Sequence, residues 1–159
     1  MISIKLICVG KLKEKYLVQA EAEYLKRLSG FCNAGVTEIA EEPCANESEA
    51  SRKLVMEAEG QRILAKIPKG AKTIALCIEG SAPDSAGFSR YIFEQAANGA
   101  GCFAFIIGGS YGLAEKVKAS ADLCLSFSKM TFPHQLMRVV LLEQIYRAFH
   151  INGNGKYHK

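Results

Sequence analysis

The sequence predicts an α/β fold, a mostly parallel sheet flanked by helices, in a single domain that spans residues 1–159. Strand-like and helix-like segments alternate along the chain, which is the pattern of a parallel sheet covered on both faces. The two central strand segments, residues 71–78 and 101–107, are almost wholly apolar, as expected for strands in the buried middle of a sheet. No repeat, low-complexity tract or linker divides the sequence, and its length fits one domain.

The first half of the chain predicts two strands and two helices. Residues 2–9 form a strand that ends at Gly10, and residues 34–40 form a second strand. A helix is predicted over residues 11–28 because apolar residues recur there every four positions, and Ser29-Gly30 closes it. A longer helix is predicted over residues 47–67, stopped by Pro68-Lys69-Gly70. Its apolar side holds Leu54, Ala58, Ile63 and Ile67.

The second half continues the alternation. Strands at residues 71–78 and 101–107 enclose a helix at residues 83–98, and a glycine turn at residues 108–112 precedes a short helix at residues 114–120. A last short strand covers residues 123–127, and Pro133 opens a final helix that runs to about residue 151. Ligands of parallel sheets gather at the carboxyl ends of the strands. The expected site therefore lies at residues 79–80, 108–112 and 126–132.

The charge distribution points to the C-terminal end. Residues 1–128 hold equal numbers of basic and acidic side chains, so the whole net charge of +4 falls within residues 129–159, together with all three histidines. A concentrated cationic end suits a polyanionic partner, although a solvated end with no partner explains the charge equally well.

Several classes of protein are disfavoured by the sequence. No apolar run reaches the roughly 20 residues that a membrane-spanning helix needs. The N-terminal segment lacks a charged leader and a small-residue cleavage site, so we expect a cytoplasmic protein with no membrane partner. The six cysteines show neither C-x-x-C spacing nor a Cys/His cluster, which predicts no metal site and favours free thiols in a reducing compartment.

The glycine turn Gly108-Gly-Ser-Tyr-Gly112 invites a nucleotide-binding interpretation, but it matches neither G-x-G-x-x-G nor the Walker pattern. An ordinary tight turn explains such a cluster as well. Glycines nevertheless let the backbone approach a ligand closely, and a strand-to-helix turn exposes free N–H donors.

The segment at residues 127–138 is denser in unusual features. His134 and Arg138 are four residues apart on a helix and therefore share a face, beside the helix N-terminus. This pair is suited to bind an anionic partner or to act on a group that must lose a proton. The alternative is that both side chains are simply solvated at the surface. The apolar positions that follow with period four indicate core or a dimer seam: Met137, Leu141, Ile145 and Phe149.

These blocks resemble a known family. Ile106-Ile-Gly-Gly-Ser-Tyr-Gly-Leu113, the segment LSFSKMTFPHQLMRVVLLEQIYRAF at residues 125–149, and Tyr157-His-Lys159 are similar to the RlmH family of ribosomal RNA large-subunit methyltransferases, of the SPOUT class. Val9-Gly-Lys-Leu-Lys-Glu-Lys-Tyr16 and Glu59-Gly-Gln-Arg-Ile-Leu64 fit as well. The resemblance therefore covers the whole chain.

The resemblance implies a homodimer with a C-terminal trefoil knot that transfers the methyl group of S-adenosylmethionine to N3 of a pseudouridine. The substrate is 23S ribosomal RNA, within the large subunit or the whole ribosome. By position, the resemblance also implies the cofactor contacts, which are Leu76, Gly108, Phe127, Ser128, Lys129, Met130, Thr131 and Phe132.

Pseudouridine N3 carries a proton at neutral pH, so the reaction needs a base or a cation that stabilises the developing anion. The candidates are His134, Arg138, Tyr157 and His158, with the tail of one subunit completing the site of the other. We expect Arg138 to stabilise charge and position the substrate, and His158 to accept the proton. These side chains could instead only grip phosphate. Two alternative functions are a non-catalytic ribosome-binding factor and a nucleotide- or flavin-binding α/β module.

Overall fold

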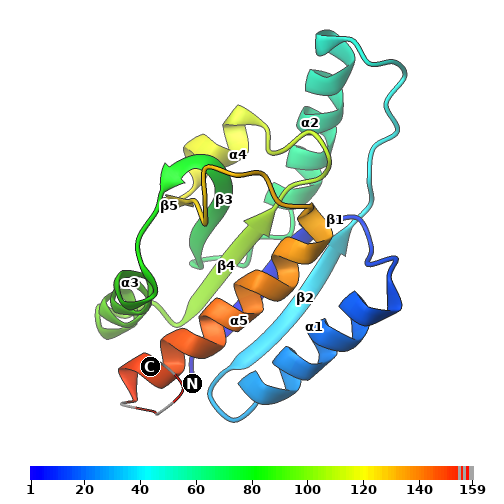
Figure 1. Cartoon of the computed structure of the whole chain (residues 1–159). Coiled ribbons are helices and arrows are strands. Elements are labelled where there is room, and N and C mark those ends of the chain that lie inside the picture. The colour runs from blue at the N-terminus through cyan, green and yellow to red at the C-terminus, as the bar shows by residue number, and fades with distance from the viewer. Residues whose placement is uncertain (154, 156, 158–159) are drawn as a thin grey trace.

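A computed structural model describes residues 1–153, 155 and 157. Its sheet has the strand order β2-β1-β4-β3-β5, and the pairings between neighbouring strands are all parallel. The predicted α/β class with a parallel sheet is therefore confirmed (Figure 1), while the knot stays a prediction. The strands are β1 (Ser3–Val9), β2 (Asn33–Ile39), β3 (Lys72–Ser81), β4 (Cys102–Ile107) and β5 (Leu123–Leu125).

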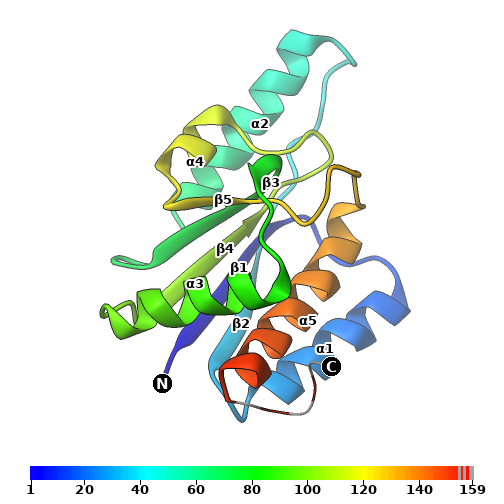
Figure 2. The ribbon, with the colours of Figure 1, turned by 60° about the vertical axis from the view of Figure 1, so that its left-hand side comes forward.

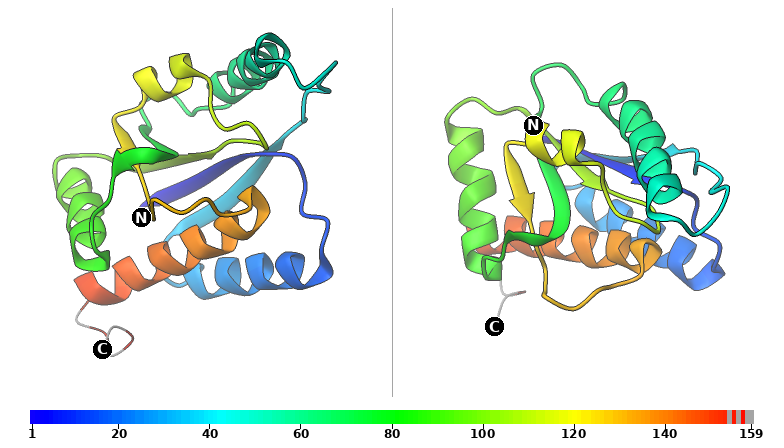
Figure 3. Two further views of the ribbon diagram at one scale, coloured as in Figure 1. Left: turned by 45° about the horizontal axis from the view of Figure 1, so that its top comes forward. Right: turned by 90° about the horizontal axis from the view of Figure 1, so that it is seen from above.

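Helices cover both faces of the sheet. The views in Figures 2 and 3 place α1, α3 and α5 on one face and α2 and α4 on the other. Within the first group, α5 packs between α1 and α3. The helices are α1 (Lys15–Leu28), α2 (Glu49–Leu64), α3 (Ser85–Ala97), α4 (Glu115–Ser120) and α5 (His134–Asn152).

The core divides into two layers because side chains alternate along each strand. On β4, Phe103 and Phe105 pack into the cluster beneath α3 and α5, whereas Ala104 and Ile106 pack into the cluster beneath α2 and α4. The predicted core positions on α5 are confirmed, since the cluster beneath α3 and α5 includes Leu141, Ile145 and Phe149.

Element ends differ from prediction where the chain turns. Helix α1 begins at Lys15 rather than residue 11, because Gly10 turns the chain with a φ of 82° and Glu14 is still extended. Helix α2 ends at Leu64 rather than residue 67. The expected apolar side of α2 was partly wrong, because Leu54 is 66% exposed.

Strand β5 is shorter than predicted because its neighbour β3 is longer. The chain at residues 80–81 crosses over β5, and the Ser126 N–H donates to the Ser81 carbonyl at 2.8 Å. A Cβ on Gly80 would lie 2.6 Å from the carbonyl carbon and oxygen of Cys124, so only glycine permits this crossing. The crossing brings the ends of β3 and β5 to one edge of the sheet.

All six cysteines are free thiols. Cys8 is buried, whereas Cys77, Cys102 and Cys124 are only partly buried. Within residues 1–153, 155 and 157, no group of His, Cys, Asp and Glu side chains could hold a metal ion. No helix in this described part of the chain is long and apolar enough to cross a membrane.

Candidate active site

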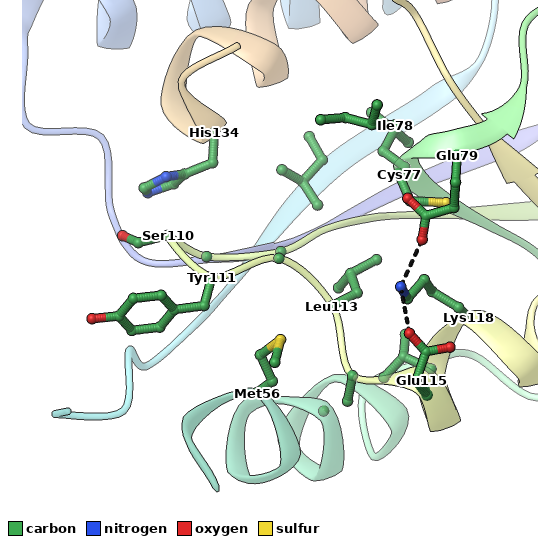
Figure 4. Close-up of a pocket in the computed structure, with 18 of the residues that line it drawn as sticks. Met56, Cys77, Ile78, Glu79, Ser110, Tyr111, Leu113, Glu115, Lys118 and His134 are labelled. Carbon is green, nitrogen blue, oxygen red and sulfur yellow. Dashed lines mark hydrogen bonds and ion pairs between the residues drawn. The ribbon is translucent and has the colours of Figure 1, made fainter. Parts of the chain in front are cut away.

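A pocket of about 1370 Å³ lies at the carboxyl ends of β3, β4 and β5. Its walls are the end of β3 (residues 76–79), the glycine turn with the start of α4 (residues 107–118) and the loop before α5 (residues 125–134). One side of α2 closes it (Figure 4). The three strand ends that the sequence singled out therefore meet in one pocket, although Gly80 itself lies against β5 instead.

At Gly108, the glycine turn is packed too closely to admit a side chain. A Cβ on Gly108 would lie 2.8 Å from both the carbonyl carbon and the carbonyl oxygen of Gly112. Gly112 has a φ of 86°, a conformation that favours glycine. Behind the turn, a Cβ on Gly109 would lie 3.1 Å from Oε2 of the buried Glu59 of α2. The backbone of this turn therefore forms the wall of the pocket directly.

Helix α2 contributes a wall that the sequence analysis missed. Arg52, Met56 and Gly60 line the pocket, and Met56 is seen beneath the glycine turn in Figure 4. A Cβ on Gly60 would lie 3.1 Å from Cγ2 of Val117, so this glycine lets α2 approach α4. Gly60 falls in the block at residues 59–64 that fits the family, whereas Arg52 and Met56 have the ordinary spacing of a surface helix and no signal distinguishes them.

Polar contacts connect the elements around the mouth of the pocket at two points. The Lys118 ammonium lies 2.6 Å from Glu79 Oε1 and 2.7 Å from Glu115 Oε1, as Figure 4 shows. Hydrogen bonds to Glu115 and Glu79 raise the pKa of Lys118, so it stays charged. On the opposite rim, the Tyr111 hydroxyl donates to Glu47 at 3.3 Å, which links the glycine turn to the segment before α2.

The loop before α5 is shaped by two serines. The Ser126 hydroxyl donates to the carbonyl oxygen of Ser128 at 3.0 Å, and the Met130 N–H donates to Ser128 Oγ at 2.9 Å. Lys129 is exposed and does not line the pocket. The other seven of the eight predicted cofactor contacts line it, namely Leu76, Gly108, Phe127, Ser128, Met130, Thr131 and Phe132.

His134 is the first residue of α5 and lines the pocket. Its Nε2 is buried, has no hydrogen-bond partner among the described residues and lies 4.0 Å from Glu41 Oε1. Burial lowers the pKa of His134, Glu41 opposes that shift, and the charges of Arg138 and Lys13 reinforce it. The imidazole is therefore neutral at pH 7, and its unpartnered nitrogen faces Glu41.

Arg138 lies outside the pocket, which does not fit the expectation that it acts on the substrate directly. Its side chain is 0% exposed. Nη1 donates to Glu38 Oε1 at 2.8 Å and lies 3.6 Å from Glu21 Oε2, and Nη2 donates to the Gly10 carbonyl. A buried guanidinium needs such partners because burial of an unpaired charge is very costly. His134 and Arg138 share a helix face, but that face points to the ends of β1 and β2.

Tyr157 lies along α5, away from the pocket of its own chain. Its hydroxyl donates to Glu143 at 3.2 Å, and the Arg147 guanidinium lies 4.8 Å from the centre of its ring. Tyr157 also contacts Tyr146 and His150. At 1.5 Å per residue, these contacts lie roughly 14 to 24 Å along the helix from His134. His158, the fourth predicted catalytic residue, falls outside the described residues.

A parallel sheet with a glycine-walled pocket at its carboxyl edge defines a ligand-binding α/β protein. A family model described as predicted SPOUT methyltransferase matches residues 2–158. The chain therefore belongs to the SPOUT methyltransferase family.

Its relatives carry a narrower name, ribosomal RNA large subunit methyltransferase H. The protein from Exiguobacterium sp. is 51% identical over 158 residues, and the one from Bacillus cytotoxicus is 52% identical over 158; each match covers 99% of both chains. The protein from Streptococcus sanguinis is 48% identical over 157 residues, covering 98% of this chain and 99% of its own. Among solved structures, a probable methylase family protein from Haemophilus influenzae gives a TM-score of 0.47 at 11% identity, covering 95% of this chain and 66% of that one.

Proposed function

We propose that the protein is an S-adenosylmethionine-dependent methyltransferase that methylates N3 of a pseudouridine in 23S ribosomal RNA. The relatives that match almost the whole chain are named as methyltransferases of large-subunit ribosomal RNA. The strongest support for the proposal is the pocket. Seven of the residues that the resemblance implies as cofactor contacts line it together.

The pocket suits S-adenosylmethionine in both shape and chemistry. Its volume of about 1370 Å³ accommodates a ligand of that size. Gly108 lets the turn close tightly against Gly112, so that backbone lines the pocket, and Leu76, Met56 and Phe127 offer apolar surface to the ligand. When bound, the sulfonium supplies an electrophilic methyl group, so the protein's main tasks are alignment and exclusion of water.

His134 is the side chain of this chain best placed to handle the N3 proton. Its imidazole is neutral at pH 7 and lines the pocket. A neutral imidazole can accept a proton, whereas an imidazolium cannot. We assign proton acceptance to His134, with Tyr157 and His158 of a second copy holding the nucleobase. His158 remains the alternative acceptor.

The position of Tyr157 supports the proposal of a homodimer. Tyr157 contacts the C-terminal half of α5, while the pocket lies at the N-terminal end of that helix. A tail that takes part in catalysis would therefore act on the pocket of another copy. Helices α1 and α5 carry exposed apolar side chains against which a second copy would pack. Val18 is 49% exposed and Leu136 is 37% exposed.

The pH profile tests the assignment of His134. Because the folded-state pKa of His134 is lowered, the neutral form persists to below pH 6.5 and is lost as the pH falls further. We expect single-turnover methylation to stay level from pH 8 to 6.5 and to fall below that. His134→Gln should lower the rate at pH 7.5 by about 100-fold, a usual effect of losing a general base. An unchanged rate in His134→Gln would assign proton acceptance elsewhere.

The function itself is tested on ribosomes from a strain that lacks this gene. The purified protein and S-adenosylmethionine labelled in its methyl group are added to whole ribosomes, large subunits and naked 23S RNA, and the modified base is mapped. One labelled pseudouridine in 23S RNA is the expected product, consistent with action in the cytoplasm. Ribosome binding without transfer would indicate a non-catalytic factor. Tight binding of a nucleoside triphosphate or flavin in place of S-adenosylmethionine would indicate a nucleotide-binding module.

A further inference from the structure

The first turn of α5 is held by contacts to distant parts of the chain. Pro133 at its N-cap provides no side-chain hydrogen bond to the helix. Instead, Gln135 Oε1 accepts the Lys13 N–H at 2.9 Å, and Arg138 reaches the ends of β1 and β2. The position of this turn matters because it carries His134 and follows directly on the pocket loop.

Arg138 is the largest fully buried side chain among the described residues, and its partners come from three other elements. Glu38 belongs to β2, Glu21 to α1, and the Gly10 carbonyl to the turn after β1. A guanidinium presents several donors in one rigid plane, so it can fix two partners at once in a way that an ammonium cannot. Any shift of the first turn of α5 would break these contacts.

We propose that Arg138 is a positioning residue that locks the first turn of α5 onto the ends of β1 and β2, and so sets the place of His134 in the pocket. Arg138 itself touches neither the cofactor nor the nucleobase. The consequence for the methylation rate rests on the proposed function, whereas the consequences for His134 and for cofactor affinity can be measured without it.

The charged groups around His134 make the proposal measurable. Glu41 follows β2, Lys13 lies in the loop before α1, and Arg138 lies one helical turn away. Behind Arg138 are the carboxylates of Glu21 and Glu38. The Cys8 thiol of β1 is also close to this cluster, but burial raises its pKa to about 12, so it is uncharged. Removing the guanidinium alone would leave two carboxylates uncompensated, which favours a protonated His134.

The test uses three variants of the full-length protein: Arg138→Met, Arg138→Lys, and the triple variant Arg138→Met/Glu21→Gln/Glu38→Gln, which leaves no buried charge unpaired. Leu141→Ala is the control, because this fully buried core residue of α5 has no part in the ion cluster. The readouts are the thermal midpoint, the His134 pKa from imidazole NMR, the Kd for S-adenosylmethionine, and kcat and KM per folded protein.

The proposal predicts a distinct pattern. For Arg138→Met, kcat should fall about 100-fold, the usual cost of a misplaced reacting group, and the His134 pKa should rise. In the triple variant the His134 pKa should rise less than in Arg138→Met, because the two carboxylates are neutralised as well, while kcat stays low because the lock is missing. Arg138→Lys should recover kcat only in part. Leu141→Ala should lose comparable thermal stability but keep kcat within about twofold, as expected for a remote packing defect.

A purely structural role would give another pattern and would overturn the proposal. Arg138→Met would then match Leu141→Ala in kcat per folded protein, even though loss of the Arg138 charge still raises the His134 pKa. Full recovery of kcat in the triple variant would also overturn it, because charge balance alone would then be sufficient. If the wild-type protein methylates no ribosomal RNA, the proposed function fails. The role of Arg138 is then decided by the Kd for S-adenosylmethionine, which should rise in Arg138→Met and in the triple variant but not in Leu141→Ala.

Discussion

Gly108→Ala is expected to weaken binding of S-adenosylmethionine by at least about 100-fold, or roughly 2.7 kcal/mol. The added Cβ would lie 2.8 Å from the carbonyl carbon and oxygen of Gly112. Backbone atoms cannot swing away as a flexible side chain can, so the whole turn must shift and the pocket wall with it. The measurement is titration calorimetry on protein that is shown to be folded by circular dichroism.

The matched control is Gly101→Ala, immediately before the opposite end of the same strand. A Cβ there meets nothing within 4 Å, so the same chemical change creates no collision. This variant should bind S-adenosylmethionine like the wild type. Equal affinities for the two variants would mean that the ligand does not lie against the glycine turn.

Deletion of residues 157–159 is expected to lower methylation by about 1000-fold, within the range for loss of groups that act on the reacting atoms. The pocket remains whole in this variant, so the Kd for S-adenosylmethionine should stay within about twofold. Stability should fall modestly, because Tyr157 contacts partly buried side chains of α5, including Glu143, Tyr146, Arg147 and His150. Single-turnover rates and calorimetry measure the two effects separately. Normal turnover would remove the tail from the mechanism.

Much of the fold could be predicted from local patterns. The apolar β4 and the glycine turn after it predicted a buried strand that ends at the site, and the structure shows both. Local patterns also limited the accuracy of the element ends. Helix α1 begins four residues later than its apolar period indicated, because the turn at Gly10 and the extended residues up to Glu14 interrupt the helix without disturbing that period.

The role of Arg138 could not be predicted in this way. Its spacing from His134 correctly indicates a shared helix face, but spacing cannot show what that face meets. The partners of Arg138 are 100 and 128 residues away in the sequence, at Glu38 and Gly10. Its place beside His134 in a cationic segment led to the expectation that it acts on the substrate directly, whereas tertiary packing makes it the most deeply buried charge of the described chain.

The central claim is that a catalytic site combines the pocket of one chain with the tail of another. The most direct test co-expresses two differently tagged inactive chains, Gly108→Ala with its tail intact and the chain that lacks residues 157–159, and isolates the mixed dimer. This dimer contains one intact pocket facing one intact tail, so it should regain about half of the wild-type rate per dimer. A mixed dimer that forms but is as inactive as either parent would contradict the account.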